Sequence, residues 1–182
     1  MESSGNKARV NKIKECYTGR NFSFTVENVT LPNGYAAEYG IVRHPGSTGI
    51  VPVLNDGRVV MVRQYRHAVG EYMLEVPAGT LERGEAPLKC AMRELEEETG
   101  FTAKEMVKVG AVHILPSYTD EVIHVFLARG LEATAQHLDG DEVLQVVSYP
   151  FDQLMEFVRD GKITDALTIL SLHRAEVFLK NA

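Results

Sequence analysis

Alternation of apolar and polar residues predicts strands over most of the chain. Residues 22–29 alternate, residues 35–42 form a second extended run, and the Leu-Pro-Asn-Gly turn at 31–34 between them predicts an N-terminal hairpin. Apolar, β-branched runs predict six further strands, at residues 49–54, 59–64, 73–76, 107–114, 122–128 and 143–149. The Asn-Asp-Gly sequence at 55–57 is typical of a hairpin turn between the first two of these strands.

Helical periodicity predicts three helices, at residues 86–99, 151–159 and 165–179. The first contains Pro87, which an opening helical turn tolerates, and is followed by Gly100, which offers a left-handed stop. This order of strands and helices predicts an α/β (α+β) fold in which helices cover the faces of a mixed sheet.

The helix at 86–99 has two different sides. Four residues at helical spacing form one stripe, which we expect to pack: Leu88, Met92, Leu95 and Thr99. Three glutamates gather on the opposite side: Glu94, Glu97 and Glu98. Like charges three or four residues apart cost about 0.2–0.5 kcal/mol per pair on an isolated helix, so a cationic partner is expected.

Carboxylates that converge in this way supply the hard oxygen ligands that Mg²⁺ and Mn²⁺ prefer. The glutamate side of the helix therefore predicts a divalent-metal site. The alternative is an ordinary solvated acidic helix face, which a run of glutamates by itself indicates more often.

The residues around this helix decide between the two. The stretch 79–101 reads Gly79, five residues, Glu85, seven residues, then Arg-Glu-Leu at 93–95, one residue, Glu-Glu at 97–98, one residue, and Gly-Phe at 100–101. This spacing matches the Nudix box at every fixed position, so the chain resembles a Nudix hydrolase. The resemblance implies a loop, helix and loop that hold divalent metal against a diphosphate while water attacks phosphorus.

The resemblance also implies a fold and an assembly. The order of elements is similar to the Nudix α/β/α sandwich, and the N-terminal hairpin resembles that of the ADP-ribose pyrophosphatase subfamily, where it builds a homodimer. We therefore expect a tail and dimerising hairpin at residues 1–45 and a Nudix hydrolase domain at 46–182. The alternative is that the hairpin extends the sheet of a single subunit.

Metal and catalytic roles follow from the matching positions of the family. The resemblance implies that the carbonyl of Ala78 and the side chains of Glu94 and Glu98 ligate Mg²⁺, with Mn²⁺ as the alternative ion. Glu97 would share a second ion, and Arg93 would orient carboxylates such as Glu85 or Glu75. Glu142 resembles the general base, although Asp139, Asp141 or a box glutamate such as Glu97 remain alternatives.

Substrate contacts are expected near the box. Arg66 matches a family position that binds phosphate, and Arg63 is either a second clamp or a surface arginine. Glu75 needs a partner or a metal because its strand is otherwise apolar. Pro116 lies 16 residues after Gly100, a spacing similar to the marker of ADP-ribose hydrolases.

Three positions depart from that subfamily. Glu38 and Gly40 stand where strict ADP-ribose hydrolases have Arg and Glu, and Ser117 stands where glycine is usual. We expect Glu38 to lie near the nucleoside, and these departures leave the identity of the nucleoside base open. The function implied is hydrolysis of ADP-ribose or a related nucleoside diphosphate sugar; the alternatives are a GDP-mannose, GDP-hexose or broad-range hydrolase.

Composition and charge narrow the remaining classes of partner and function. A net charge of −6 disfavours nucleic-acid and anionic-membrane partners, and hence a capped-RNA substrate. Cys16 and Cys90 form no disulfide framework, and the N-terminus lacks an apolar leader, so a cytoplasmic enzyme is expected. A Nudix-fold module that binds nucleotide sugars without cleaving them is the alternative from another class; the intact box disfavours it.

Overall fold

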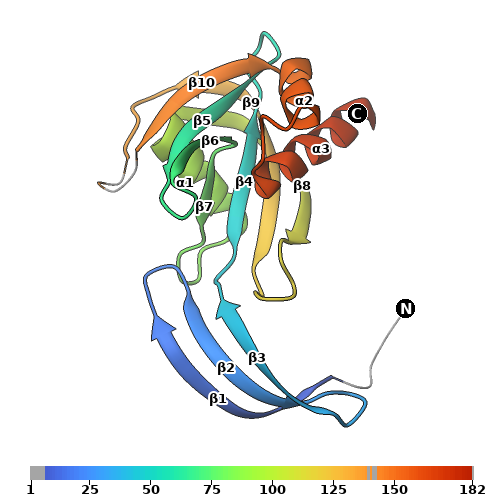
Figure 1. Ribbon diagram of the computed structural model, residues 1–182. Coiled ribbons are helices and arrows are strands. Elements are labelled where there is room, and N and C mark those ends of the chain that lie inside the picture. The colour runs from blue at the N-terminus through green and yellow to red at the C-terminus, as the bar shows by residue number, and fades with distance from the viewer. Residues whose placement is uncertain (1–6, 139, 141–142, 182) are drawn as a thin grey trace. The chain divides into compact units, whose positions relative to one another are not determined.

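The computed structural model describes residues 7–138, 140 and 143–181 of the chain (Figure 1). The chain forms two compact units: residues 1–45 with 115–121, and residues 46–114 with 122–182. None of the helices in the described part is long and apolar enough to cross a bilayer.

The first unit is a three-stranded antiparallel sheet with the order β1-β2-β3. Its strands are β1 (Arg9–Thr18), β2 (Ser23–Thr30) and β3 (Ala36–Arg43). The predicted hairpin is confirmed as β2 and β3, with Gly34 at φ 84° in the turn between them. The prediction missed β1, because every residue of that strand is exposed and its sequence does not alternate; pairing with β2 forms it instead of burial.

The second unit contains a three-stranded sheet, β10-β5-β6, and a four-stranded sheet, β7-β4-β9-β8. The strands are β4 (Ser47–Pro52), β5 (Arg58–Arg66), β6 (Glu71–Glu75), β7 (Ala78–Thr80), β8 (Phe101–His113), β9 (Val122–Ala133) and β10 (Leu144–Pro150). The four-stranded sheet is mixed, since β4 runs parallel to β9 and antiparallel to β7. All six predicted strands in this unit are therefore present.

The predicted turn at residues 55–57 joins strands of different sheets. The amide of Leu54 donates to the carbonyl of Arg58 at 2.8 Å, which closes the turn. Val53 and Val59 then form a single isolated bridge, after which β4 and β5 pair with other strands. The predicted hairpin turn is therefore present, but the pairing between the two strands does not extend beyond this bridge.

Three helices complete the second unit: α1 (Pro87–Thr99), α2 (Phe151–Arg159) and α3 (Ala166–Asn181). Successive residues of β4 face opposite layers: Ile50 packs with Leu95 of α1, whereas Val51 shares a core with Leu154 of α2 and Leu172 of α3. Because successive side chains of a strand point to opposite faces, β4 contributes to two separate hydrophobic cores, one on each side of the sheet layer. Figure 1 shows α1 on one side of the strands and α2 and α3 on the other, which confirms the α/β/α sandwich.

Helix α1 begins one residue later than predicted and ends where predicted, but it buries a different side. Leu88 and Met92 are 45% and 50% exposed, so the predicted packing stripe is wrong for these two residues. The buried positions are Cys90, Ala91, Glu94, Leu95, Glu98 and Thr99. The buried side includes two glutamates because polar groups of neighbouring segments are available to them, which helical spacing alone does not reveal.

Candidate active site

Strand β7 and helix α1 approach each other at one glycine. A Cβ atom at residue 79 would lie 1.9 Å from both Cδ and Oε1 of Glu94, so only glycine leaves room for this carboxylate. Glu94 is 8% exposed. Gly79 thus provides a cradle that holds the Glu94 carboxylate against the backbone of β7.

Glu98 is tied to the same strand one turn further along α1. Its Oε2 accepts a hydrogen bond from the backbone amide of Ala78 at 3.0 Å, and the residue is only 2% exposed. The side-chain amide of Gln136 donates to the backbone carbonyl of Glu98 at 2.5 Å. Residues 78 and 79 therefore position the carboxylates of both buried glutamates.

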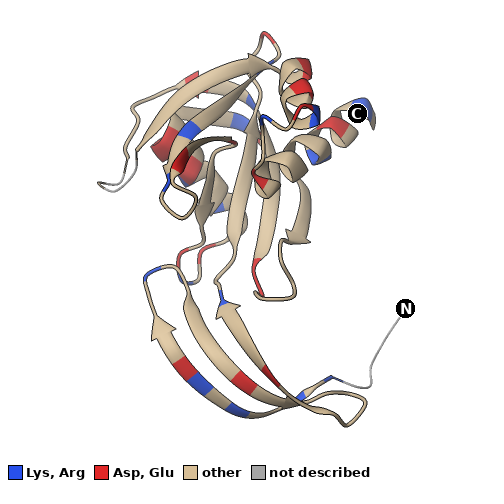
Figure 2. Ribbon diagram, in the orientation of Figure 1, with Lys and Arg blue, Asp and Glu red and all other residues tan. Residues whose placement is uncertain are grey.

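Arg93 is the expected cationic partner of the acidic side. Its Nε and Nη2 each donate to Glu85 at 3.0 Å, while Nη1 donates to Glu94 at 2.7 Å and to Glu97 at 2.9 Å. The pKa of Arg93 is raised, first by its hydrogen bonds to Glu85 and then by the other glutamates; in return, Arg93 lowers the pKa of Glu85. The predicted orienting contact with Glu85 is present, and Figure 2 shows the acidic residues gathered on α1.

Arg66 and Glu75 form a further charged pair in the second unit. Arg66 Nε donates to both oxygens of Glu75 at 3.0 and 3.1 Å, and Nη2 donates to Oε2 at 2.5 Å. Glu75 is 4% exposed, so the partner that its apolar strand required is Arg66 rather than Arg93. Glu75 raises the pKa of Arg66, and the charges of Glu98 and Asp165 raise it further by smaller amounts. The Arg66–Glu75 pair therefore lies within electrostatic range of Glu98 on α1.

Arg63 lies on the opposite face of β5 from Arg66. Residues three apart on a strand point to opposite faces. The guanidinium of Arg63 lies 4.7 Å from the ring centroid of Tyr72, and Tyr72 in turn packs edge-on against Tyr65. The structure therefore brings Arg66, and not Arg63, together with Glu75.

Glu38 and Pro116 belong to the first unit. Glu38 Oε2 accepts a hydrogen bond from Asn28 Nδ2 at 3.3 Å across the β2–β3 ladder. Pro116 lies in the segment 115–121, which is attached to β3: the amide of Val42 donates to the carbonyl of Tyr118 at 2.8 Å, and Arg43 Nη1 donates to Asp120 at 2.9 Å. Their roles toward a substrate stay predictions.

The predicted general base, Glu142, lies outside the described residues, as do its alternatives Asp139 and Asp141. The next residue, Val143, is described and directly precedes β10. Its carbonyl accepts a hydrogen bond from the amide of Tyr65 on β5 at 2.9 Å. Immediately after residue 142 the chain therefore pairs with β5, the strand that carries Arg66.

The donor set of this cluster suits a hard divalent cation. Glu94, Glu97, Glu98 and the carbonyl of Ala78 offer only oxygen atoms, and the glycine cradle places the Glu94 carboxylate beside the same strand as that carbonyl. Among the described residues, no three acidic, histidine or cysteine side chains are gathered closely enough to form a complete metal centre. Arg93 instead bridges Glu94 and Glu97, whose oxygens are thereby kept within one cluster.

Sequence reasoning missed two parts of this site. The sequence showed Gly79 only as a fixed glycine of the spacing pattern. It did not reveal that Gly79 lies against the carboxylate of Glu94. Cys90 is fully buried between the backbone of β7 and the hydroxyl of Thr48, which lies 3.5 Å from its sulfur, and burial raises the pKa of its thiol to about 11. A cysteine inside a predicted helix gave no signal for that packing.

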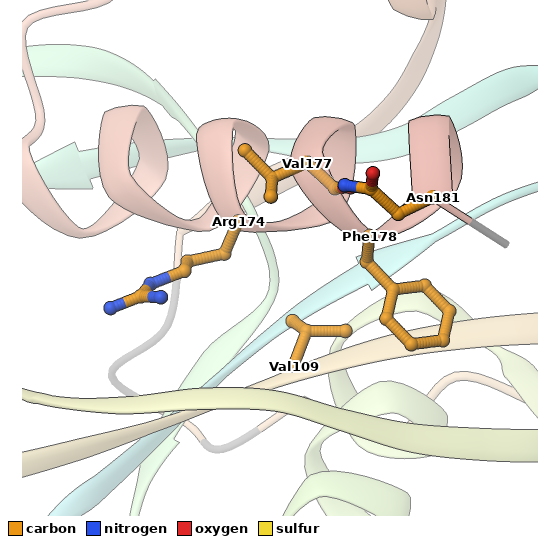
Figure 3. Close-up of a pocket in the computed structure, with 5 residues that line it drawn as sticks. All are labelled: Val109, Arg174, Val177, Phe178 and Asn181. Atoms are coloured by element: carbon orange, nitrogen blue, oxygen red, sulfur yellow. The ribbon is translucent and has the colours of Figure 1, made fainter.

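A separate hollow of about 420 Å³ lies on the other side of the second unit, between β8 and α3. Five residues line it, as Figure 3 shows: Val109, Arg174, Val177, Phe178 and Asn181. None of the residues predicted for catalysis, metal or substrate is among them.

Comparison with known proteins gives four relevant similarities. A family model described as the NUDIX domain matches residues 43–167. An ADP-ribose pyrophosphatase of Bacillus subtilis (strain 168) is 38% identical over 161 residues, covering 87% of each chain, and a methanol dehydrogenase activator of Bacillus methanolicus is 36% identical over 163 residues, covering 88% of each. The crystal structure of an ADP compounds hydrolase has the same fold, with a TM-score of 0.84, 23% identity, and coverage of 99% of this chain and 98% of that one.

Proposed function

Because the chain belongs to the Nudix hydrolase family, we propose that it hydrolyses the diphosphate bond of nucleoside diphosphate sugars, with ADP-ribose as the preferred substrate. The products are a nucleoside monophosphate and a sugar phosphate. The similarity to an ADP-ribose pyrophosphatase over 87% of both chains supports this substrate class.

The observation that carries the proposal is the pair of buried glutamates beside β7. Glu94 and Glu98 are 8% and 2% exposed, and burying such carboxylates is costly unless strong partners compensate. Arg93 and the amide of Ala78 supply part of that compensation. A solvated acidic helix face would not need a glycine cradle, so the arrangement favours an ion-binding active site.

Glu94, Glu97, Glu98 and the Ala78 carbonyl would hold the metal, with Mg²⁺ as the proposed ion and Mn²⁺ as the alternative. A divalent cation bound there neutralises the diphosphate and stabilises charge that develops on the attacking and leaving oxygens. Arg93 keeps the carboxylates in place, and Arg66, anchored by Glu75, presents its guanidinium to phosphate oxygens. Glu142 is the proposed acceptor of the proton from the attacking water.

A panel of nucleoside diphosphate sugars at fixed Mg²⁺ tests the substrate class. A coupled phosphatase releases phosphate from the two monoester products but not from the intact diphosphate, so phosphate release measures turnover directly. We expect the highest kcat/KM with ADP-ribose; a higher value with GDP-mannose would move the assignment to the alternative substrate. Tight binding without phosphate release would instead identify the non-catalytic binding module.

A homodimer and a cytoplasmic location remain proposals. The first unit supports the dimer because it leaves many large apolar side chains exposed in the single chain: Val10, Ile13, Tyr17, Phe22, Tyr35 and Tyr39. Phe24 and Val26, in the alternating stretch 22–29, are only partly exposed, whereas three of these six exposed residues, Val10, Ile13 and Tyr17, lie on β1.

A further inference from the structure

Gln64 is a buried polar residue that the mechanism above does not use. It is 8% exposed, and its Oε1 atom is buried without a hydrogen-bond partner among the residues that the structure describes. Leaving a buried carbonyl oxygen unpaired destabilises a folded protein, and such atoms are rare enough in native structures to need an explanation.

Strand register places Gln64 on the catalytic face of β5. It is two residues from Arg66, so both side chains leave the strand on the same face. Gln64 pairs with Met73 of β6, two residues before Glu75, and with Leu144 at the start of β10. The residue therefore lies between the Arg66–Glu75 pair and the point where the chain returns from residue 142.

We propose that Gln64 binds the substrate by accepting a hydrogen bond from a sugar hydroxyl; this inference rests on the proposed hydrolysis of nucleoside diphosphate sugars. An amide oxygen is an acceptor, so it repels the anionic phosphate oxygens and favours an O–H donor. Residues two apart on a strand are separated by roughly 6.6 Å, about the distance between a phosphate group and the hydroxyls of the sugar attached to it. A phosphate held at Arg66 then brings a sugar hydroxyl to Gln64.

The buried position of the oxygen is compatible with this role. The last side-chain torsion of glutamine is broad, so the carboxamide can rotate and present its oxygen to a ligand. Within the described part of the free protein the oxygen is unpaired, and the substrate supplies its missing donor. Gln64 thus costs stability in the free enzyme and contributes affinity in the complex.

Gln64→Met tests the inference, because methionine keeps the length of the side chain and removes the acceptor. We expect KM for ADP-ribose to rise about fivefold to tenfold, the loss typical of one neutral hydrogen bond. Tm should stay the same or rise, since the unpaired oxygen is gone. Ser171→Ala is the matched control: Ser171 is fully buried in α3, and its Oγ also lacks a partner among the described residues, but it belongs to the opposite layer. This control should leave KM unchanged.

Substrate analogues decide the outcome and identify the sugar. Wild-type enzyme should discriminate against ADP-ribose that lacks one hydroxyl, either on the adenosine ribose or on the distal ribose, and Gln64→Met should lose that discrimination. A variant that still discriminates as the wild type does would overturn the role of Gln64, whatever its Tm. Failure of the wild type to hydrolyse any nucleoside diphosphate sugar would contradict the proposed function itself, and this inference with it.

Discussion

Gly79 and Glu94 meet so closely that the residue at position 79 has no room for a side chain. An added Cβ would lie 1.9 Å from the Glu94 carboxylate, yet the atoms it meets are the far end of a flexible side chain and not backbone. The carboxylate can therefore move aside at little cost to the fold. Its displacement would remove it from the cluster that Arg93 organises.

Gly79→Ala should accordingly separate activity from stability. We expect kcat to fall about a hundredfold, equivalent to about 2.7 kcal/mol of barrier, with little change in Tm. Gly110→Ala is the control, since its Cβ would lie 3.3 Å from the Arg174 side chain, away from α1. Equal kcat values for both variants would show that the Glu94 position does not matter for turnover.

Arg93→Lys should impair both stability and activity. The guanidinium donates to three carboxylates at once, and a single ammonium cannot reproduce the paired bonds to Glu85 while it reaches Glu94 and Glu97. We expect a loss of about 1–3 kcal/mol in the free energy of unfolding and at least about a tenfold loss in kcat/KM. Urea denaturation and steady-state kinetics measure the two effects.

Arg58→Lys is the matched control for that variant. Arg58 pairs with Asp56 in an exposed turn, where both side chains are about half exposed. Such surface pairs contribute at most about 1 kcal/mol, so stability and activity should stay close to wild type. A similar loss in both variants would show that the Arg93 network has no special role.

The sequence predicted the bounds of α1 well because the signals are local. Pro87 and Gly100 fix the first and last turns through their own backbone preferences. The buried side of the helix was not predictable, since Glu94 and Glu98 gain their partners only when β7 packs against α1. The sequence left Arg63 as either a second phosphate clamp or a surface arginine. In the structure Arg63 lies on the opposite face of β5 from Arg66 and contacts Tyr72.

Cysteine reactivity should differ sharply between the two thiols. Burial raises the pKa of Cys90 to about 11, so its reactive thiolate is scarce at pH 8, whereas Cys16 is exposed on β1. Iodoacetamide at pH 8 should alkylate one thiol of the native protein and two after denaturation, as intact mass spectrometry would show. Rapid modification of both thiols in the native protein would contradict the burial of Cys90 against β7.

The proposed dimer predicts a mass near twice 20.2 kDa by light scattering at micromolar concentration. Ile13→Glu places a charge among the exposed apolar residues of β1 and should shift the mass toward 20.2 kDa. Val69→Glu, at a residue that is 58% exposed in the second unit, should leave the mass unchanged. A wild-type mass of 20.2 kDa, that of a single chain, would contradict the proposed dimer.

The most direct test of the catalytic assignment is the turnover of ADP-ribose by Glu98→Gln at saturating Mg²⁺. Glutamine keeps the size of the side chain and an oxygen that accepts the Ala78 amide, but it removes the charge of a residue that is 2% exposed. We expect kcat to fall at least about a hundredfold, or about 2.7 kcal/mol, while Tm without metal stays equal or rises. Glu96→Gln, at a half-buried glutamate of the same helix, should keep wild-type turnover. A Glu98→Gln enzyme that retains most of its kcat would contradict the role of the α1 carboxylates.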